Sequence, residues 1–128
     1  MTATRHLPDP ARRAAYGLGL RSETIAALFL RMKGYHVVAR RHQTPVGEID
    51  LIVRRGRTVA FVEVKARPTL DMAAESIRLY QQSRIVRAAE AFLSRNPRLN
   101  GYDLRFDAVL IAPGRLPRHL PAAFDAGR

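Results

Sequence analysis

The chain contains no cysteine, which excludes a disulfide framework, a thiolate metal site and a cysteine nucleophile. It also lacks any apolar run that approaches the roughly 18 residues of a membrane-spanning helix. The first residues, Met1 to His6, lead into Pro and Asp and not into the apolar core of a signal peptide. We therefore expect a soluble, cytoplasmic protein with no membrane partner.

Acidic residues are scarce relative to basic ones. Among 128 residues, 11 Asp and Glu stand against 22 Lys and Arg, which gives a net charge of +11. Arginine far outnumbers lysine, and the guanidinium fork matches phosphate oxygens in pairs. So strong a positive field favours a polyanionic partner, most often nucleic acid. The alternative is a solvated basic surface in an organism with an arginine-rich proteome.

The length of the chain suits a single domain, because single domains most often have roughly 100–150 residues. Residues 1–12 contain two prolines and little pattern, so we expect a flexible N-terminal arm there. The folded domain is expected over residues 13–112. From Pro113 the sequence is rich in Pro, Arg and Ala, which predicts a C-terminal tail over residues 113–128.

Two stretches carry apolar residues at helical spacing. The first predicts a helix over residues 13–33, which Gly34 ends. The second predicts a single helix over residues 73–95, which Asn96-Pro97 ends. The expected apolar stripes are Ile25, Leu28, Phe29 and Met32 on the first helix, and Ile77, Ile85, Ala88, Ala89 and Phe92 on the second.

Strand-like runs lie between and after the helices. The runs 49–53 and 58–64 flank a glycine turn, which predicts a β-hairpin. The other predicted strands are 35–39, followed by a polar loop or frayed strand over 40–46, and 104–111. The order helix, three strands, helix, strand predicts a small α/β sandwich in which helices flank a central mixed sheet.

The hairpin places acidic residues among apolar neighbours. Side chains alternate between the two faces of a strand, so Asp50, Glu63 and Lys65 fall on one face of the hairpin. A two-residue turn at Arg55-Gly56 would set Asp50 opposite Phe61. Asp50 and Glu63 would then be diagonal neighbours about 7–8 Å apart at the backbone, a gap that their side chains can close.

Two neighbouring carboxylates repel each other unless a proton or a cation joins them. A hard divalent ion such as Mg²⁺ accepts carboxylate oxygens, keeps several waters and binds phosphate oxygens. An ammonium group beside it offsets charge on a phosphate in the transition state. Asp50, Glu63 and Lys65 therefore suit metal-assisted phosphodiester hydrolysis. The alternative is an exposed hairpin face with ordinary charges, or carboxylates that pair with arginines.

The two hairpin strands, Gly47-Glu48-Ile49-Asp50-Leu51-Ile52 and Phe61-Val62-Glu63-Val64-Lys65-Ala66-Arg67, resemble the signature of PD-(D/E)XK nucleases. More narrowly, the chain resembles the YraN family, a bacterial group related to archaeal Holliday-junction resolvases. The resemblance implies a restriction-endonuclease-like or resolvase-like α/β fold, an endodeoxyribonuclease activity and a Mg²⁺ or Mn²⁺ cofactor.

The resemblance also assigns roles to residues. Asp50 and Glu63 match the metal-binding carboxylates, Lys65 matches the motif lysine, and the Val64 carbonyl lies where such nucleases add a backbone ligand. Glu23 on the first helix matches an acidic residue that reaches the metal site, and its alternative is a solvent-exposed helix glutamate. Glu48 is a candidate for support around the metal or for anchoring its loop.

Two further positions follow from the resemblance. Family members carry a lysine on the second helix where this chain has Gln81, three residues before Arg84, which leaves phosphate contact at this position in doubt. Asp107 belongs to a family motif on the last predicted strand and is expected to have a structural role. His36 and His42 show no metal-ligand spacing, so we expect them to be structural or surface residues.

We expect the partner to be DNA, branched or damaged DNA included. A homodimer is the expectation by analogy with resolvases alone. The residues expected to contact nucleic acid are Arg40, Arg41, Arg67, Arg78 and Arg84. Two rival interpretations stay open, a non-catalytic nucleic-acid-binding module that kept the fold and a structural partner in a DNA repair or uptake complex.

Overall fold

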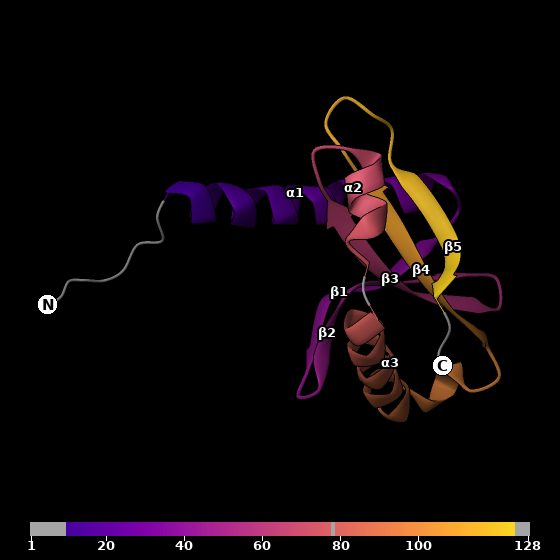
Figure 1. Ribbon diagram of the computed structural model, residues 1–128. Coiled ribbons are helices and arrows are strands. Elements are labelled where there is room, and N and C mark those ends of the chain that lie inside the picture. Colours follow the sequence, from indigo (N-terminus) through magenta and orange to yellow (C-terminus); the bar gives the residue numbers. More distant parts are fainter. Residues whose placement is uncertain (1–9, 78, 125–128) are drawn as a thin grey trace, which may run out of the picture.

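The computed structural model describes residues 10–77 and 79–124, and within them it describes the side chains of residues 21–77 and 83–123. The helices of this part are α1 (Pro10–Met32), α2 (Leu70–Glu75) and α3 (Leu79–Ser94), with a short 3-10 turn, η1 (Pro97–Leu99). Its strands are β1 (His36–Thr44), β2 (Gly47–Arg55), β3 (Thr58–Ala66), β4 (Asp103–Ile111) and β5 (Arg118–Phe124) (Figure 1).

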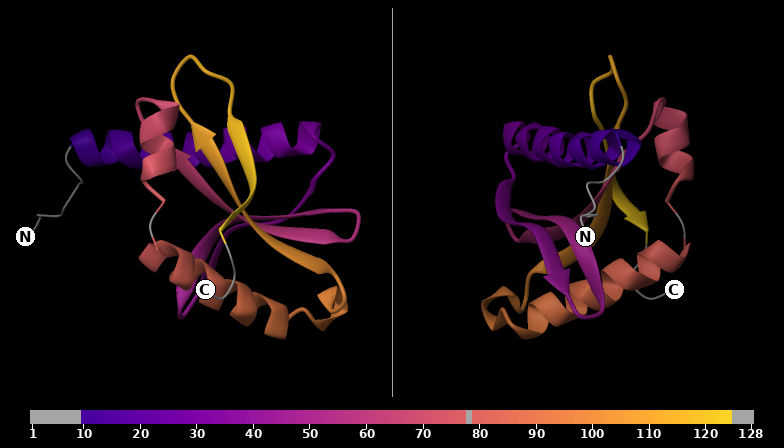
Figure 2. Two further views of the ribbon diagram at one scale, coloured as in Figure 1. Left: turned by 45° about the vertical axis from the view of Figure 1, so that its right-hand side comes forward. Right: turned by 90° about the vertical axis from the view of Figure 1, so that its left-hand side faces the viewer.

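The five strands form one mixed sheet in the order β1-β2-β3-β4-β5. Only the β3–β4 pair is parallel, and α2 and α3 lie in the crossover that a parallel pair requires. α1 packs on one face of the sheet, whereas α2 and α3 pack on the other (Figure 2). The predicted α/β sandwich with a central mixed sheet flanked by helices is confirmed. No helix of the described part is long and apolar enough to span a membrane.

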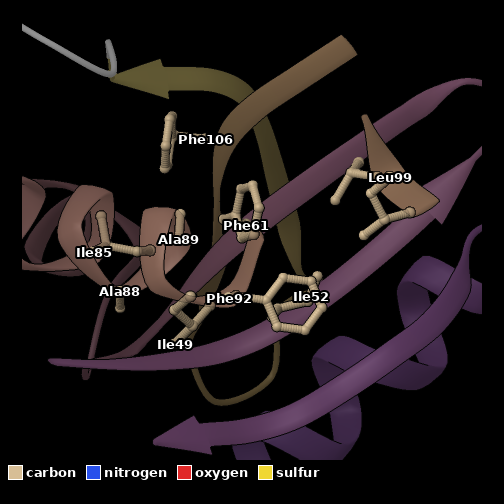
Figure 3. Packing of buried hydrophobic residues seen from close by; sticks show 10 residues of the cluster. Ile49, Ile52, Phe61, Ile85, Ala88, Ala89, Phe92, Leu99 and Phe106 are labelled. Atoms are coloured by element: carbon tan, nitrogen blue, oxygen red, sulfur yellow. The ribbon is translucent and has the colours of Figure 1, made fainter. Parts of the chain in front are cut away.

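The apolar core between α3 and the sheet fixes where the second helix lies. Ile85, Ala89 and Phe92 of α3 face Phe61 and other apolar side chains of the sheet (Figure 3). Phe61 stacks on Phe106 and meets Phe92 edge-on, with ring centroids 5.5 and 6.2 Å apart. The apolar stripe predicted for residues 85–92 is therefore confirmed, and it holds α3 across the hairpin.

α1 begins three residues before its predicted start, so residues 10–12 of the expected arm are helical, and residues 1–9 lie outside the described part. Its predicted end at Gly34 is confirmed. Gly34 has a φ of +94°, and the N–H groups of Gly34 and Tyr35 donate to the carbonyls of Arg31 and Leu30. This pattern is a Schellman motif, in which a left-handed glycine closes the helix.

The apolar stripe predicted for α1 was wrong. Ala26, Ala27 and Leu30 face the sheet and are buried, whereas Leu28 and Met32 are 52% and 86% exposed. Ile25 is exposed as well, and Phe29 is half-buried. Helical spacing alone could not select the correct face, because both sides of the helix carry apolar residues and the buried side uses small alanines.

The first strand is longer than predicted. β1 extends from His36 to Thr44, so most of the expected loop over 40–46 is paired strand instead. The ladder to β2 shifts between Val37 and Ala39, and Arg41 has a φ of +50°. The sequence of β1 lacks an apolar strand pattern because the strand lies at the edge of the sheet, where one side of the backbone and most side chains meet solvent.

The β2–β3 hairpin is confirmed, but its register differs by two residues from the predicted one. Ile52 rather than Asp50 pairs with Phe61, because the turn residues are Gly56-Arg57 and not Arg55-Gly56. A shift of two preserves the alternation of faces, so the predicted grouping of Glu63 with Asp50 survives. Ile49 is an exception, because it packs with the α3 cluster and not with Leu51.

The single helix predicted over 73–95 was wrong, since α2 ends at Glu75 and α3 begins at Leu79. The Ser76 hydroxyl and the Ser76 N–H both donate to the Ala73 carbonyl. Such side-chain contacts compete with continued helix. Ile77 then packs against two apolar clusters, the one under α3 and the one under α2.

The segment expected to be a tail contains β5, which pairs with β4 as an antiparallel edge strand. Pro121 lies inside this strand, and prolines are tolerated at the edge of a sheet because no neighbour there needs the missing N–H. The Pro-rich composition that predicted a tail is therefore compatible with an edge strand. Residues 125–128 of the expected tail lie outside the described part.

Candidate active site

The site begins with Asp50, which lies just beyond the last paired residues of the hairpin ladder, Leu51 and Val62. Continuing the same register by one residue places Asp50 beside Glu63. The Asp50 Oδ2 atom accepts a hydrogen bond from the Val64 backbone N–H at 2.8 Å. A side-chain carboxylate therefore continues the contact between β2 and β3 where the backbone ladder stops.

Burial raises the pKa of Asp50 to about 6, well above its usual value of 3.8. The hydrogen bond from Val64 lowers this pKa, and the nearby negative charge of Glu63 raises it further. The Lys65 ammonium lowers it in turn. The ionised form of Asp50 is thus under-compensated, which is the situation that a cation relieves.

Glu63 and Lys65 form an ion pair on the same face, with Lys65 Nζ 2.8 Å from Glu63 Oε2. Their side chains are 15% and 11% exposed, so water screens this pair less than a surface pair. Glu63, Lys65 and Asp50 lie together, as the sequence predicted. In the predicted register Asp50 and Glu63 were diagonal neighbours, whereas the observed register places them side by side.

A pocket of about 190 Å³ opens over these residues. Its lining residues are Glu48, Asp50, Glu63, Arg84 and Ile85. Three carboxylates therefore share one pocket with one guanidinium group. The sequence analysis named Glu48 as support for the metal or its loop and Arg84 as a nucleic-acid contact, and both line the pocket.

Gly47 sets the distance between the hairpin and α3. A Cβ atom added at Gly47 would lie 2.9 Å from the Arg84 backbone carbonyl oxygen, closer than real contacts allow. Only glycine lets the start of β2 approach α3 this closely. The glycine of the Gly47-Glu48-Ile49-Asp50 string therefore brings Arg84 to the acidic pocket.

Glu23 lies on the face of α1 that meets the sheet and is 4% exposed, so the alternative of a solvent-exposed glutamate is wrong. Its Oε1 atom lies 3.5 Å from the Arg40 guanidinium and 4.0 Å from that of Arg41. Its Oε2 atom is buried, and among the described residues it has no hydrogen-bond partner. Glu23 does not line the pocket of Asp50 and Glu63.

The arginines expected to contact nucleic acid lie in different surroundings. Arg40 and Arg41 are exposed at the edge strand and also approach Glu23, while Arg67 donates to the Ala66 carbonyl. Arg84 lines the pocket. Arg78 and the side chains of Gln81 and Gln82 lie outside the described part, so the predicted role of Gln81 stays a prediction.

Arginines at the tip of the hairpin have partners within the chain. Arg55 donates to the Lys33 carbonyl and covers the Tyr35 ring, and Arg57 covers the Tyr102 ring. These contacts favour a structural role for the tip over contact with DNA. His42 has a similar role, because its ring meets Phe92 edge-on at 5.0 Å.

Asp107 has the structural surroundings expected of it. It is fully buried and accepts two hydrogen bonds from the Arg105 guanidinium, one from the His119 ring and one from the Ala122 N–H. Sequence analysis missed His119 because it treated this part of the chain as a tail. An alternation signal was weak there, since Pro121 interrupts it.

Within the described part, no group of three His, Asp or Glu side chains is arranged closely enough to hold a metal ion by itself. Asp50 and Glu63 are instead two carboxylates beside an open pocket. Mg²⁺ typically uses one or two protein carboxylates and takes its remaining ligands from water and substrate phosphates. The donor set is therefore compatible with such an ion.

Fold and site together define a small, basic α/β protein with a partly buried acidic pocket at the end of a hairpin. The chain belongs to the uncharacterised protein family UPF0102, whose model matches residues 22–111. It is 56% identical over 126 residues to a UPF0102 protein of Rhodopseudomonas palustris strain HaA2, which covers 98% of both chains. It is 57% identical over 118 residues to a UPF0102 protein of Methylorubrum extorquens, with 92% of each chain covered.

Proposed function

We propose that this protein is a Mg²⁺- or Mn²⁺-dependent endonuclease that hydrolyses DNA phosphodiester bonds and belongs to the PD-(D/E)XK nucleases through the YraN group. One observation carries the proposal. Asp50, Glu63 and Arg84 line a single open pocket, Lys65 forms an ion pair with Glu63, and burial raises the pKa of Asp50 to about 6. A carboxylate pair with adjacent cations is suited to binding a divalent ion together with a phosphate.

Asp50 and Glu63 would hold the ion, and the Val64 carbonyl is the backbone group placed beside them. Glu23 lies outside this pocket, so its expected role as a metal ligand stays a prediction. When bound, the ion supplies a water of lowered pKa and withdraws charge from the phosphorus. The positive charge of the ion would also stabilise the ionised form of Asp50, which burial disfavours.

Lys65 and Arg84 have complementary tasks in this proposal. Lys65 lies 2.8 Å from Glu63 and would offset the charge that develops on the phosphate oxygens. Arg84 stands on α3 at the edge of the pocket, where its guanidinium would orient the phosphate backbone. The net charge of +11 would attract DNA over longer range.

The test is a cleavage screen with purified protein on linear, nicked, flapped and four-way DNA, each with Mg²⁺ and with Mn²⁺. Asp50→Asn and Glu63→Gln should each lose metal-dependent cleavage while keeping the fold. The exposed residues Asp103 and Glu90 offer matched controls, since Asp103→Asn and Glu90→Gln make the same chemical changes away from the pocket. Cleavage that survives in both pocket variants, or is absent from the wild type on every substrate, would contradict the proposal.

One observation favours a second candidate, a nucleic-acid-binding module without catalysis. Glu23, which the family resemblance assigns to the metal site, lies outside the pocket and is engaged with Arg40. Such a module would bind the same DNA substrates with equal affinity in the presence and absence of divalent ions. Calorimetric titration of Mn²⁺ into the wild type, Asp50→Asn and Glu63→Gln separates the two candidates, because only a nuclease site should lose metal binding in the variants.

A further inference from the structure

Two hollows lie at the end of the sheet where β3 and β4 finish. The first, of about 510 Å³, lies between α1 and these strand ends, and its lining includes Ile25 and Ile111. The second, of about 320 Å³, lies between the start of α2 and the β4–β5 loop, which are neighbours in Figures 1 and 2. Because Pro68, Pro113 and Arg115 line both hollows, we treat them as one surface, the strand-end groove.

The half of the strand-end groove beside α1 is apolar. Its apolar walls include Ile25, Ala66, Ile111, Ala112, Pro113 and Pro117. Ile25 is 43% exposed, and Leu116 in the adjoining loop is 83% exposed. Large apolar side chains left to solvent around a hollow are typical of a binding surface. The volume of this half lies in the range of ligand pockets, so it can accept a bulky apolar side chain.

The half of the groove beside α2 is basic. Arg115 and Arg118 line it together with one carboxylate, Asp71, and Arg67 lines the apolar half. Arg115 and Arg118 are exposed, and neither forms an ion pair with a carboxylate of the described part. Three guanidinium groups therefore stand against one carboxylate, and guanidinium groups bind further carboxylates in a two-pronged geometry.

We propose that the strand-end groove binds an acidic peptide segment of another protein. The segment places a bulky apolar side chain in the half beside α1 and neighbouring aspartates or glutamates beside Arg115 and Arg118. The DNA backbone supplies negative charge without such a side chain, and a bilayer surface is too flat to fill a hollow between two elements. A second copy of this chain also carries a net charge of +11, which opposes its approach to a basic groove.

The strand-end groove is separate from the acidic pocket of Asp50 and Glu63. No residue of the described part lines both, because the acidic pocket is bounded by Arg84 and Ile85 of α3. A bound segment would therefore attach a partner protein to the domain and leave the acidic pocket open. Peptide binding requires neither a metal ion nor DNA, so its test is independent of the proposed nuclease activity.

The experiment titrates the full chain, in the presence of a chelator, into a hexapeptide of four aspartates followed by two phenylalanines. Fluorescein at the aspartate end reports binding by anisotropy. We expect saturable binding that weakens at least about tenfold when alanines replace the phenylalanines, because apolar burial is lost. Asparagines in place of the aspartates should weaken binding by about as much, because several ion pairs are lost together.

Variants of the protein test the two halves of the groove separately. Combined Arg115→Ala and Arg118→Ala should lower the affinity about tenfold, whereas Arg98→Ala removes an exposed arginine elsewhere and should have little effect. Ile25→Asp should lower the affinity by at least as much, because it places a carboxylate in the apolar wall. Leu104→Asp is its matched control, since Leu104 is similarly exposed at the opposite end of β4. Circular dichroism checks the fold of each variant.

Two results with the peptide would overturn the proposal. One is equal affinity for the peptides with and without phenylalanine, which would show attraction by charge alone. The other is an affinity in the folded groove variants equal to that of their controls. Dimers in sedimentation that Ile25→Asp dissociates would assign the groove to a second copy instead. Binding to phosphatidylglycerol vesicles that Ile25→Asp abolishes, without binding of the peptide, would assign it to a lipid surface.

Discussion

The Asp50 carboxylate accepts a hydrogen bond from the Val64 backbone N–H at 2.8 Å, so a side chain joins β2 to β3 where the strands stop pairing. The same carboxylate is the most perturbed acid of the pocket, with a pKa raised to about 6 by burial. Asp50 therefore serves the fold and the site at once. In the metal-free protein, the ionised form of Asp50 lowers the stability of the fold, and this loss of stability can be measured.

The first prediction is that Asp50→Asn stabilises the metal-free protein at pH 7.5. Because the folded pKa of Asp50 is raised from 3.8 to about 6, its favourable contribution is full below pH 3.8 and is lost as the pH rises through 6. Asparagine can still accept the Val64 hydrogen bond without the buried charge. We expect a gain on the order of 2 kcal/mol at pH 7.5 that disappears near pH 4.

Urea unfolding of both proteins from pH 4 to 8 in the presence of a chelator measures this difference. Added Mn²⁺ should reverse its sign, since only the wild type gains binding energy from the metal. A stability difference that does not vary with pH would show that burial does not perturb Asp50.

The second prediction concerns Asp107, whose replacement by Asn should cost about 3–5 kcal/mol at neutral pH, because Arg105 loses its buried counter-charge and one of the two acceptor oxygens becomes a donor amide. Burial by itself would raise the pKa of Asp107, but hydrogen bonds from His119, Arg105 and Ala122 lower it to about 2. The stabilisation is therefore present above pH 3.8 and is lost as the pH falls through 2.

Thermal and denaturant unfolding of Asp107→Asn checks this, with the exposed Asp103→Asn as a control expected to stay within about 0.5 kcal/mol of wild type. The gap between wild type and Asp107→Asn should narrow below pH 3. Equal stability of the two at pH 7 would mean that the network around Asp107 contributes nothing.

The third prediction is that Gly47→Ala separates α3 from the hairpin. The added methyl group would meet the Arg84 carbonyl oxygen at 2.9 Å, so the helix or the strand must shift. We expect a loss of about 1–3 kcal/mol of stability, the range for overpacked sites. Cleavage and DNA binding should fall together, because Arg84 moves away from the carboxylates.

Gly56→Ala, at a turn with open space around it, is the comparison for the effect of replacing a glycine. Normal DNA affinity in a folded Gly47→Ala variant would mean that the position of Arg84 is unimportant.

The fourth prediction is that DNA affinity falls steeply with salt and that Arg84 contributes to the slope. Each phosphate neutralised on duplex DNA adds about −0.9 to the slope of log K against log salt. Arg84→Ala should therefore reduce the slope by about one phosphate equivalent. Arg57→Ala should leave it unchanged, since that guanidinium lies over Tyr102 and donates to Gly101. Fluorescence anisotropy with a labelled duplex across a salt series measures both slopes, and equal slopes for the two variants would remove Arg84 from the DNA contact.

Sequence patterns gave correct predictions where the rule behind them does not depend on the exact register. The grouping of Asp50 with Glu63 depended only on alternation, so a two-residue slip in register left it intact. Sequence patterns gave wrong predictions where tertiary packing decides which side of an element is buried. The buried side of α1 uses Ala26 and Ala27, which carry less apolar surface than the exposed Leu28 and Met32. Ser76 gave no strong signal of a helix break, and Pro121 argued against a strand that only an edge position permits.

The two edges of the sheet have a consequence for the behaviour of many copies of the protein in solution. β5 carries Pro121, which offers no N–H, and Ala122 beside it has a φ of +52°. β1 is irregular too, with a shift after Val37 and a left-handed Arg41. An incoming strand from a neighbouring molecule would find a missing N–H donor at one edge, and an irregular strand with exposed arginine side chains at the other. These irregularities disfavour edge-to-edge polymerisation of the sheet between copies of the protein.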